Sequence, residues 1–135
     1  MAFALAKRGH RVFATARNPS KIPSELAVLS VVTTLELDVT STESVSKAVD
    51  AVARATEQGL DVLVNNAGAG YTMPLLDVDI EEAQRLFDAN IWGSLRTTQG
   101  FSELLIAAKG RVFNVSSVGA FVNTPWLGKR SSLYC

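Results

Sequence analysis

Two neighbouring hydroxyls, Ser116 and Ser117, follow a short apolar segment near the end of the 135-residue chain. A serine hydroxyl can donate a hydrogen bond to a carbonyl oxygen or accept one from an alcohol, so it can hold a small polar substrate. Further upstream, another apolar segment is followed by Asn65-Asn66-Ala67-Gly68. Polar and small residues directly after apolar strands are typical of a ligand site at one edge of a sheet. Taken alone, a serine in such a place is more often a cap or turn residue.

Apolar periodicity predicts the elements that position these residues. The expected strands cover residues 11–16, 31–37, 60–64 and 111–115, and the expected helices cover 2–8, 42–57 and 79–107, with one or two helical turns in 23–29. Gly9 is expected to end the first helix, and a Ser or Thr cap with Glu43 in the first turn to begin the second. Apolar strands that alternate with helices predict an α/β fold with a doubly wound, Rossmann-like parallel sheet, covered on both faces.

The composition limits the classes of function. The 13 basic and 13 acidic residues cancel, which gives no sign of a nucleic-acid partner or a polybasic membrane anchor. The apolar runs are far shorter than the roughly 20 residues of a membrane span. With one cysteine and one histidine, neither a disulfide framework, a metal site nor a Ser-His-Asp triad is expected. We expect an intracellular, cytoplasmic protein, and association with a lipid surface stays open.

The residues after the four expected strands carry a family resemblance. They are Arg17, Asp38-Val39, Asn65 to Gly68 and Ser116-Ser117, and the long helix adds Asn90 and Gly93. In this order and spacing they resemble the short-chain dehydrogenase/reductase family of nicotinamide-dependent oxidoreductases, over residues 1–128. Members similar to hydroxysteroid dehydrogenases and to fungal 1-acyldihydroxyacetone-phosphate reductases are nearest. The resemblance implies hydride transfer between NADP(H) and a carbonyl/alcohol pair, with a lipid-linked ketone as one candidate substrate.

The resemblance assigns cofactor contacts to Arg17, Asp38, Val39, Asn65, Ala67 and Gly68. Arg17 could pair with the 2′-phosphate of NADP, and no carboxylate ends its strand, so NADP(H) is favoured over NAD(H). An ordinary solvated arginine is the other interpretation. Asp38 matches an aspartate that binds the adenine amino group, or it caps the next helix, and both roles can hold together. Ala67 and Gly68 would let the backbone approach the cofactor closely, whereas Asn65 could also bond neighbouring strands.

Two residues match catalytic positions of the family. Ser117 matches the serine that hydrogen-bonds the substrate carbonyl or hydroxyl. Asn90 matches the asparagine that distorts its helix and helps to hold a proton-relay water. Asparagine has a low helix propensity, so a mid-helix Asn90 points to a cause other than propensity.

The sequence departs from the family pattern in two places. No Gly-x-Gly-x-x-Gly turn occurs, and Arg130 stands where the family places the tyrosine of its Tyr-x-x-x-Lys pair. Arginine does not release its proton in proteins, and Tyr134 comes four positions too late. We therefore expect a partial domain, truncated at both ends, with an aberrant tail over 129–135 and no activity as written. A homo-oligomer is expected only of a complete protein. A catalytically dead nucleotide-binding or interaction isoform, and a non-functional product, are the alternatives.

Overall fold

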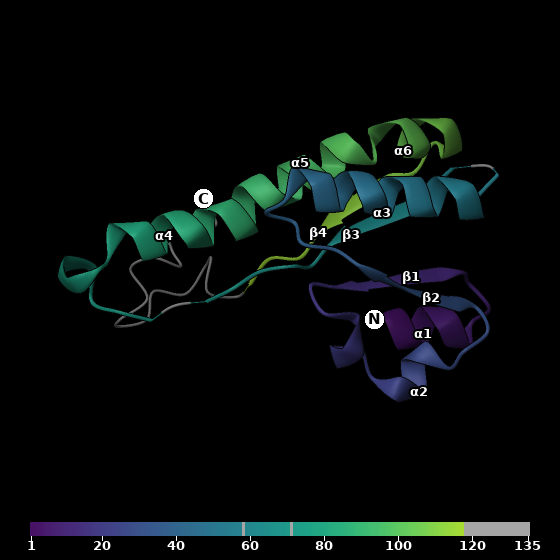
Figure 1. The fold of residues 1–135 in the computed structure, drawn as a ribbon, viewed down its shortest axis with the longest axis horizontal. Coiled ribbons are helices and arrows are strands. Elements are labelled where there is room, and N and C mark those ends of the chain that lie inside the picture. Colours follow the sequence, from purple (N-terminus) through teal and green to yellow (C-terminus); the bar gives the residue numbers. More distant parts are fainter. Residues whose placement is uncertain (58, 71, 118–135) are drawn as a thin grey trace. The chain divides into compact units, whose positions relative to one another are not determined.

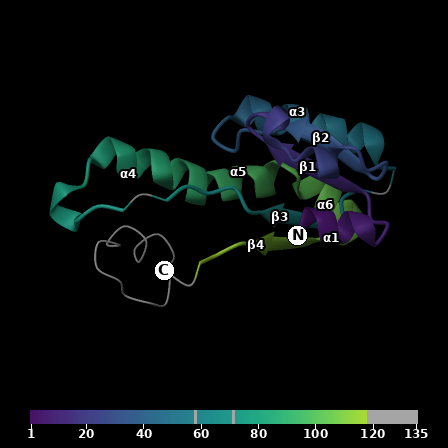
Figure 2. The same cartoon turned by 90° about the horizontal axis from the view of Figure 1, so that it is seen from below.

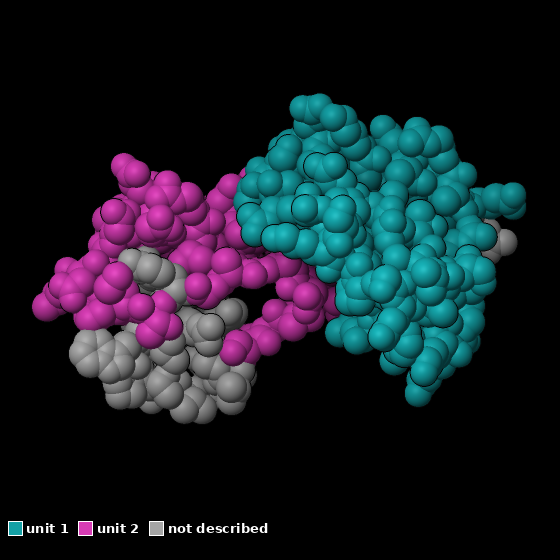
Figure 3. Space-filling view, turned by 60° about the horizontal axis from the view of Figure 1, so that its bottom comes forward, with its two compact units in different colours: residues 1–57 teal, residues 58–135 magenta. Residues whose placement is uncertain are grey.

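The computed structural model describes residues 1–57, 59–70 and 72–117. The chain divides into two compact units, residues 1–57 and residues 58–135, which Figure 3 draws in different colours. Among the described residues, each unit holds one pair of parallel strands, and the two pairs are separate sheets. The predicted tail, with Arg130 and Tyr134, lies outside the described residues.

The elements of unit 1 are α1 (Ala2–Lys7), β1 (Val12–Ala16), the 3₁₀ turn η1 (Pro19–Lys21), α2 (Ser24–Ala27), β2 (Val32–Glu36) and α3 (Thr42–Ala55). Those of unit 2 are β3 (Val62–Asn65), the 3₁₀ turn η2 (Leu75–Asp77), α4 (Ile80–Phe87), the π-helical turn η3 (Asp88–Trp92), α5 (Gly93–Gly100), α6 (Ser102–Ala108) and β4 (Arg111–Asn114). The four predicted strands and the helical segments of unit 1 are confirmed within a few residues. The helix predicted over 79–107 is confirmed in its extent but is not one regular helix, because the π-helical turn η3 lies between α4 and α5 and Phe101 separates α5 from α6. No helix in the described ranges is long and apolar enough to cross a bilayer.

In unit 1, α1 and α2 pack against the β1–β2 pair (Figure 1). Their shared core contains Ala6 of α1, Ala14 of β1 and Leu26 of α2. The predicted stop of α1 at Gly9 is confirmed. Gly9 has φ +83°, its N–H donates to Ala6 O at 3.0 Å, and the N–H of His10 donates to the α1 carbonyl of Leu5 at 3.3 Å. This is the paired bonding of a Schellman motif, which a glycine at C′ permits without strain.

Helix α3 begins at a serine cap, as predicted. The Ser41 side chain accepts a hydrogen bond from the N–H of Ser44 at 3.2 Å, and Glu43 lies in the first turn. The buried residues Val45, Ala48 and Val52 recur at spacings of three and four. Such spacing places them on one face of the helix, which is therefore the face that packs inward.

In unit 2, β3 and β4 pair in parallel, from Val62 opposite Arg111 to Asn65 opposite Asn114. The connection between these strands is helical, and α4, η3 and α5 follow one another as a continuous rod in both views (Figures 1 and 2). All four residues of β4 are exposed. Both faces of β4 are therefore open to solvent in this structure.

The predicted closure of the long helix at Lys109-Gly110 is confirmed, but the two residues have different tasks. Lys109 takes the left-handed conformation, with φ +51°, and the N–H of Gly110 donates to Leu105 O at 2.7 Å. A Cβ atom on Gly110 would lie 2.2 Å from the carbonyl oxygen of Leu60. The glycine is therefore required by the close approach of the chain that leads into β3, rather than by its own dihedral angles.

Candidate functional site

The parallel pair of unit 1 brings two predicted cofactor residues to one edge. Ala16 is paired with Glu36, and the N–H of Leu37 donates to Ala16 O at 3.0 Å. Arg17 follows Ala16 directly, and Asp38 follows Leu37. Both side chains therefore leave the carboxyl ends of neighbouring strands, where open α/β sheets bind their ligands.

Arg17 offers a positive charge at this edge. Its side chain is exposed and makes no hydrogen bond or ion pair with another residue of the described ranges. A carboxylate, Glu36, ends the neighbouring strand β2 opposite Ala16. The pKa of Lys47 on α3 is raised chiefly by its hydrogen bond and charge pairing with Glu43, and further by Glu36. Glu36 thus contributes to the pKa of Lys47, which leaves open its effect on Arg17 at the neighbouring strand end.

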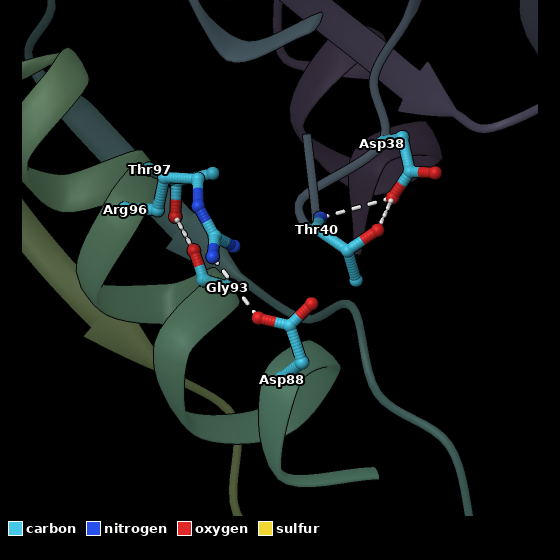
Figure 4. A network of polar contacts seen from close by, with 6 residues as sticks. All are labelled: Asp38, Thr40, Asp88, Gly93, Arg96 and Thr97. Carbon is cyan, nitrogen blue, oxygen red and sulfur yellow. Dashed lines mark hydrogen bonds and ion pairs between the residues drawn. The ribbon is translucent and has the colours of Figure 1, made fainter. Parts of the chain in front are cut away.

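Asp38 shapes the loop before α3. Its Oδ1 accepts hydrogen bonds from the N–H of Thr40 at 2.9 Å and from the Thr40 hydroxyl at 2.7 Å (Figure 4). Its own N–H donates to Ser44 Oγ at 2.9 Å. The alternative that Asp38 caps α3 is wrong, because Ser41 is the cap residue. Asp38 instead forms an Asx turn, which also fixes the half-buried Val39 between the two bonded residues. Adenine recognition by Asp38 stays a prediction.

In unit 2, Asn65 joins both strands to α5. The side chain is buried, with 9% of the residue exposed. Its Nδ2 donates to Asn114 Oδ1 at 2.8 Å and to Thr98 Oγ1 at 3.1 Å, and its Oδ1 accepts from Thr97 Oγ1 at 2.8 Å. Asn65 therefore bonds a neighbouring strand, as expected of its structural role, although its partner there is a side chain and not the backbone.

Sequence reasoning missed the partners of Asn65. Thr97 is only 2% exposed, and its hydroxyl also lies 2.8 Å from the carbonyl oxygen of Gly93, one turn earlier in α5 (Figure 4). Two adjacent threonines inside a helix, Thr97 and Thr98, have a low helix propensity, as Asn90 does. That weakness was the available signal that α5 contributes polar side chains to the strand ends.

Asn90 lies at the centre of η3, so the predicted helix distortion at this residue is present. Its Nδ2 donates to Ala69 O at 3.0 Å, and its Oδ1 accepts from the N–H of Ala69 at 2.9 Å. The amide thus clamps both backbone groups of one residue in the loop after β3. A Cβ atom on Gly68 would lie 3.3 Å from Asn90 Oδ1, a tight contact. Gly68 thereby leaves room for the clamp, and Ala67 and Gly68 are both exposed.

Ser117 leaves the same edge of the β3–β4 pair as the Asn65 loop. The N–H of Val115 donates to Asn65 O at 2.9 Å, which extends the pairing by one residue, and the half-buried Ser117 follows two positions later. Ser117 and Asn90 can bind and orient a ligand, but neither side chain exchanges a proton readily near neutral pH. Within residues 1–57, 59–70 and 72–117, no group of three His, Cys, Asp or Glu side chains could hold a metal ion.

Comparison with known proteins decides the family. The sequence pattern of the short chain dehydrogenases matches residues 1–132. The chain belongs to this family of oxidoreductases. A short-chain dehydrogenase of Penicillium ochrochloron is 45% identical over 132 residues, which are 98% of this chain and 48% of that protein. The NADPH-dependent 1-acyldihydroxyacetone phosphate reductase of Schizosaccharomyces pombe is 35% identical over 122 residues, 90% of this chain and 40% of that one.

A solved structure shows the same fold. The alcohol dehydrogenase of the archaeon Thermococcus sibiricus, complexed with 5-hydroxy-NADP, matches with a TM-score of 0.84 and 29% identity, over 98% of this chain and 59% of that one. The predicted family and the doubly wound α/β class are both confirmed. The chain spans about half the length of these three proteins.

Proposed function

We propose that the residues described above serve an NADP(H)-dependent reductase or dehydrogenase that acts on a carbonyl/alcohol pair. The observation that carries the cofactor choice is the exposed Arg17, which makes no hydrogen bond or ion pair within the described ranges and follows β1 at the same sheet edge as Asp38. A 2′-phosphate at Arg17 would gain a charge-assisted hydrogen bond of about 1.5–3 kcal/mol. NAD(H) would gain no such bond. The NADPH-dependent relative and the relative complexed with an NADP derivative support the same choice.

The residues of unit 1 fit the adenosine half of NADP(H). Arg17 supplies a cation for the 2′-phosphate, and Asp38 and Val39 lie at the same edge of the β1–β2 pair, where the adenine would rest. In unit 2, considered by itself, Ala67 and Gly68 are small and exposed, as close approach of a cofactor requires. The sequence holds no Gly-x-Gly-x-x-Gly turn, so we assign no pyrophosphate contact to it.

Bound NADPH would supply the hydride, and this chain would orient the substrate. In this proposal the Ser117 hydroxyl donates a hydrogen bond to the carbonyl oxygen, and Asn90 keeps the loop after β3 in place through Ala69. No Tyr-x-x-x-Lys pair follows Ser117 at the family spacing, so we expect this chain alone to bind NADP(H) without turnover. A lipid-linked ketone is the proposed substrate class, supported by the relative that is an acyldihydroxyacetone phosphate reductase. We expect such an enzyme to work in the cytoplasm, where NADPH is available.

An NMR titration of the full chain tests the proposed nucleotide site. Adenosine 2′,5′-bisphosphate is expected to shift the backbone amides of Arg17, Asp38 and Val39, and to bind at least about tenfold more tightly than 5′-AMP. Arg17→Asp should abolish that difference. Arg54→Asp makes the same charge change at an exposed position on α3 and should leave it intact. Equal affinities for the two nucleotides would contradict the assignment of Arg17.

Turnover tests the reaction. NADPH oxidation measured with a panel of ketones should be undetectable for this chain. In a longer protein that joins these residues to a Tyr-x-x-x-Lys pair, reduction is expected, and Ser117→Ala should lower kcat strongly. Turnover by the chain alone that Ser117→Ala abolishes would show that a different residue supplies the proton. Unchanged kcat in the longer Ser117→Ala variant would remove the serine from the site.

A further inference from the structure

The ion pair between Asp88 and Arg96 differs from the pairs Lys47–Glu43 and Arg85–Glu82 of the described residues. Arg96 Nη2 lies 3.0 Å from Asp88 Oδ1, and the two side chains are 24% and 40% exposed, in that order (Figure 4). The pairs Lys47–Glu43 and Arg85–Glu82 join residues four and three positions apart, and their side chains are 49–77% exposed. Asp88 and Arg96 are eight positions apart and more enclosed, so their contact depends on the path of the helix between them.

That path contains the π-helical turn. In a regular α-helix, eight residues rotate about 80° beyond two full turns, whereas seven residues stop about 20° short of two turns. In η3 the N–H of Gly93 donates to the carbonyl of Asp88, five positions earlier, which inserts one residue into the helix. The insertion gives Asp88 and Arg96 the alignment of residues seven apart. The Arg96 side chain also leans toward the helix N-terminus, as helical side chains do, and so reaches Asp88.

The same turn determines where Asn90 points. Asn90 is the third of the five residues of η3, and its amide holds both backbone groups of Ala69. A regular α-helix lacks the inserted residue. If η3 became regular, the residues on one side of it would rotate by about 100° relative to those on the other. Asn90 would then lose its alignment with Ala69, and Asp88 would lose its alignment with Arg96. The ion pair and the amide clamp therefore require the same helical register.

We propose that the Asp88–Arg96 ion pair positions Asn90, by holding η3 in its π-helical register and so keeping the Asn90 amide on the backbone of Ala69. Asp88 and Arg96 are positioning residues, and Asn90 is the group that they align. The claim that this positioning aids hydride transfer rests on the proposed function. The positioning itself does not rest on it, and the experiment that tests it measures no enzymatic activity.

Amide hydrogen exchange of the full chain, measured by NMR, tests this inference. The Ala69 N–H is expected to exchange at least about tenfold faster in Asp88→Asn and in Arg96→Met. The double variant should be faster by less than the product of the two single effects, because both substitutions remove the same Asp88–Arg96 pair. Arg96→Lys, which keeps the charge, should restore part of the protection. The N–H of Leu105, which donates to Phe101 O at 3.0 Å in α6, should exchange at an unchanged rate.

The exposed Glu82–Arg85 pair on α4 is the matched control, since it lies on the same rod but does not span η3. Glu82→Gln and Arg85→Met should leave Ala69 exchange within about twofold. Should the Asp88 or Arg96 variants not fold, raising NaCl from about 0.05 M to about 0.5 M in the unaltered protein screens the pair and should speed exchange at Ala69 more than at Leu105. Unchanged exchange at Ala69, or equal acceleration at Ala69 and Leu105, would overturn the inference.

Discussion

Thr97→Val is a sharp perturbation of the polar network that joins α5 to the strand ends. Valine has nearly the shape of threonine but no hydroxyl. The substitution removes the hydroxyl whose proton Asn65 Oδ1 and Gly93 O share, both 2.8 Å from its oxygen, at a position only 2% exposed. Since Asn65 is itself 9% exposed, water has little access to the oxygen that loses its partner. The variant therefore tests a buried, unsatisfied acceptor with almost no change in packing.

The expected cost is the lost hydrogen bond plus part of the penalty for the unsatisfied acceptor. These sum to about 2–3 kcal/mol of unfolding free energy. Urea unfolding followed by tryptophan fluorescence measures it, since the two tryptophans of the chain, Trp92 and Trp126, both lie within residues 58–135. This choice of probe matters because two compact units need not unfold in one transition.

Thr97→Ser is the matched control. It keeps the hydroxyl and removes one methyl group, which should cost about 0.8 kcal/mol. The valine variant is therefore expected to be the less stable of the two. A valine variant as stable as the unaltered chain, or more stable than the serine variant, would show that the Asn65 network contributes little to stability.

Three further outcomes are expected elsewhere. Gly110→Ala should lower the free energy of unfolding in urea by at least about 2 kcal/mol, because its Cβ would lie 2.2 Å from the Leu60 carbonyl oxygen. An unchanged urea unfolding curve would mean that the chain can shift there. Ser41→Ala should lower the stability of α3 by about 1 kcal/mol, measured by urea titration of the helical circular dichroism signal. An unchanged titration curve would show that Ser41 does not stabilise the helix as a cap. Glu43 has its pKa lowered by the hydrogen bond and charge of Lys47, so their mutual stabilisation is present above the usual value of 4.5 and is lost as the pH falls through the lowered pKa. In Lys47→Met an NMR titration should show the Glu43 pKa rise toward 4.5, and an unmoved pKa would contradict the pairing.

Local signals allowed much of the fold to be predicted. Gly9 and Lys109-Gly110 mark helix ends because positive φ angles and close backbone approach favour few residue types, and both stops are confirmed. Asp38 was harder, because an aspartate before a helix can form a cap or an Asx turn and both use the same side-chain oxygen. In the structure Asp38 forms the Asx turn, and Ser41 caps α3.

The interactions that build the site depend on contacts between distant residues. Thr97 lies 32 positions after Asn65, and no periodicity within α5 reveals that partner. The π-helical turn adds one residue between two short helices, which is too small a change for a 3.6-residue pattern to detect. The family resemblance predicts a role for Asn90, but its clamp on Ala69 and the Asp88–Arg96 pair depend on tertiary contacts that no local sequence signal shows.

The most direct test of the proposed NADP(H) dependence is calorimetric titration of the full chain and of its Arg17→Asp variant with NADPH and NADH. The unaltered chain is expected to bind NADPH at least about tenfold more tightly than NADH, since about 1.4 kcal/mol at the 2′-phosphate suffices for a factor of ten. Arg17→Asp should remove or reverse this preference, because it replaces the cation with a carboxylate. Equal affinity of the unaltered chain for both cofactors, or a variant that still prefers NADPH, would contradict the assignment and reduce Arg17 to a surface charge.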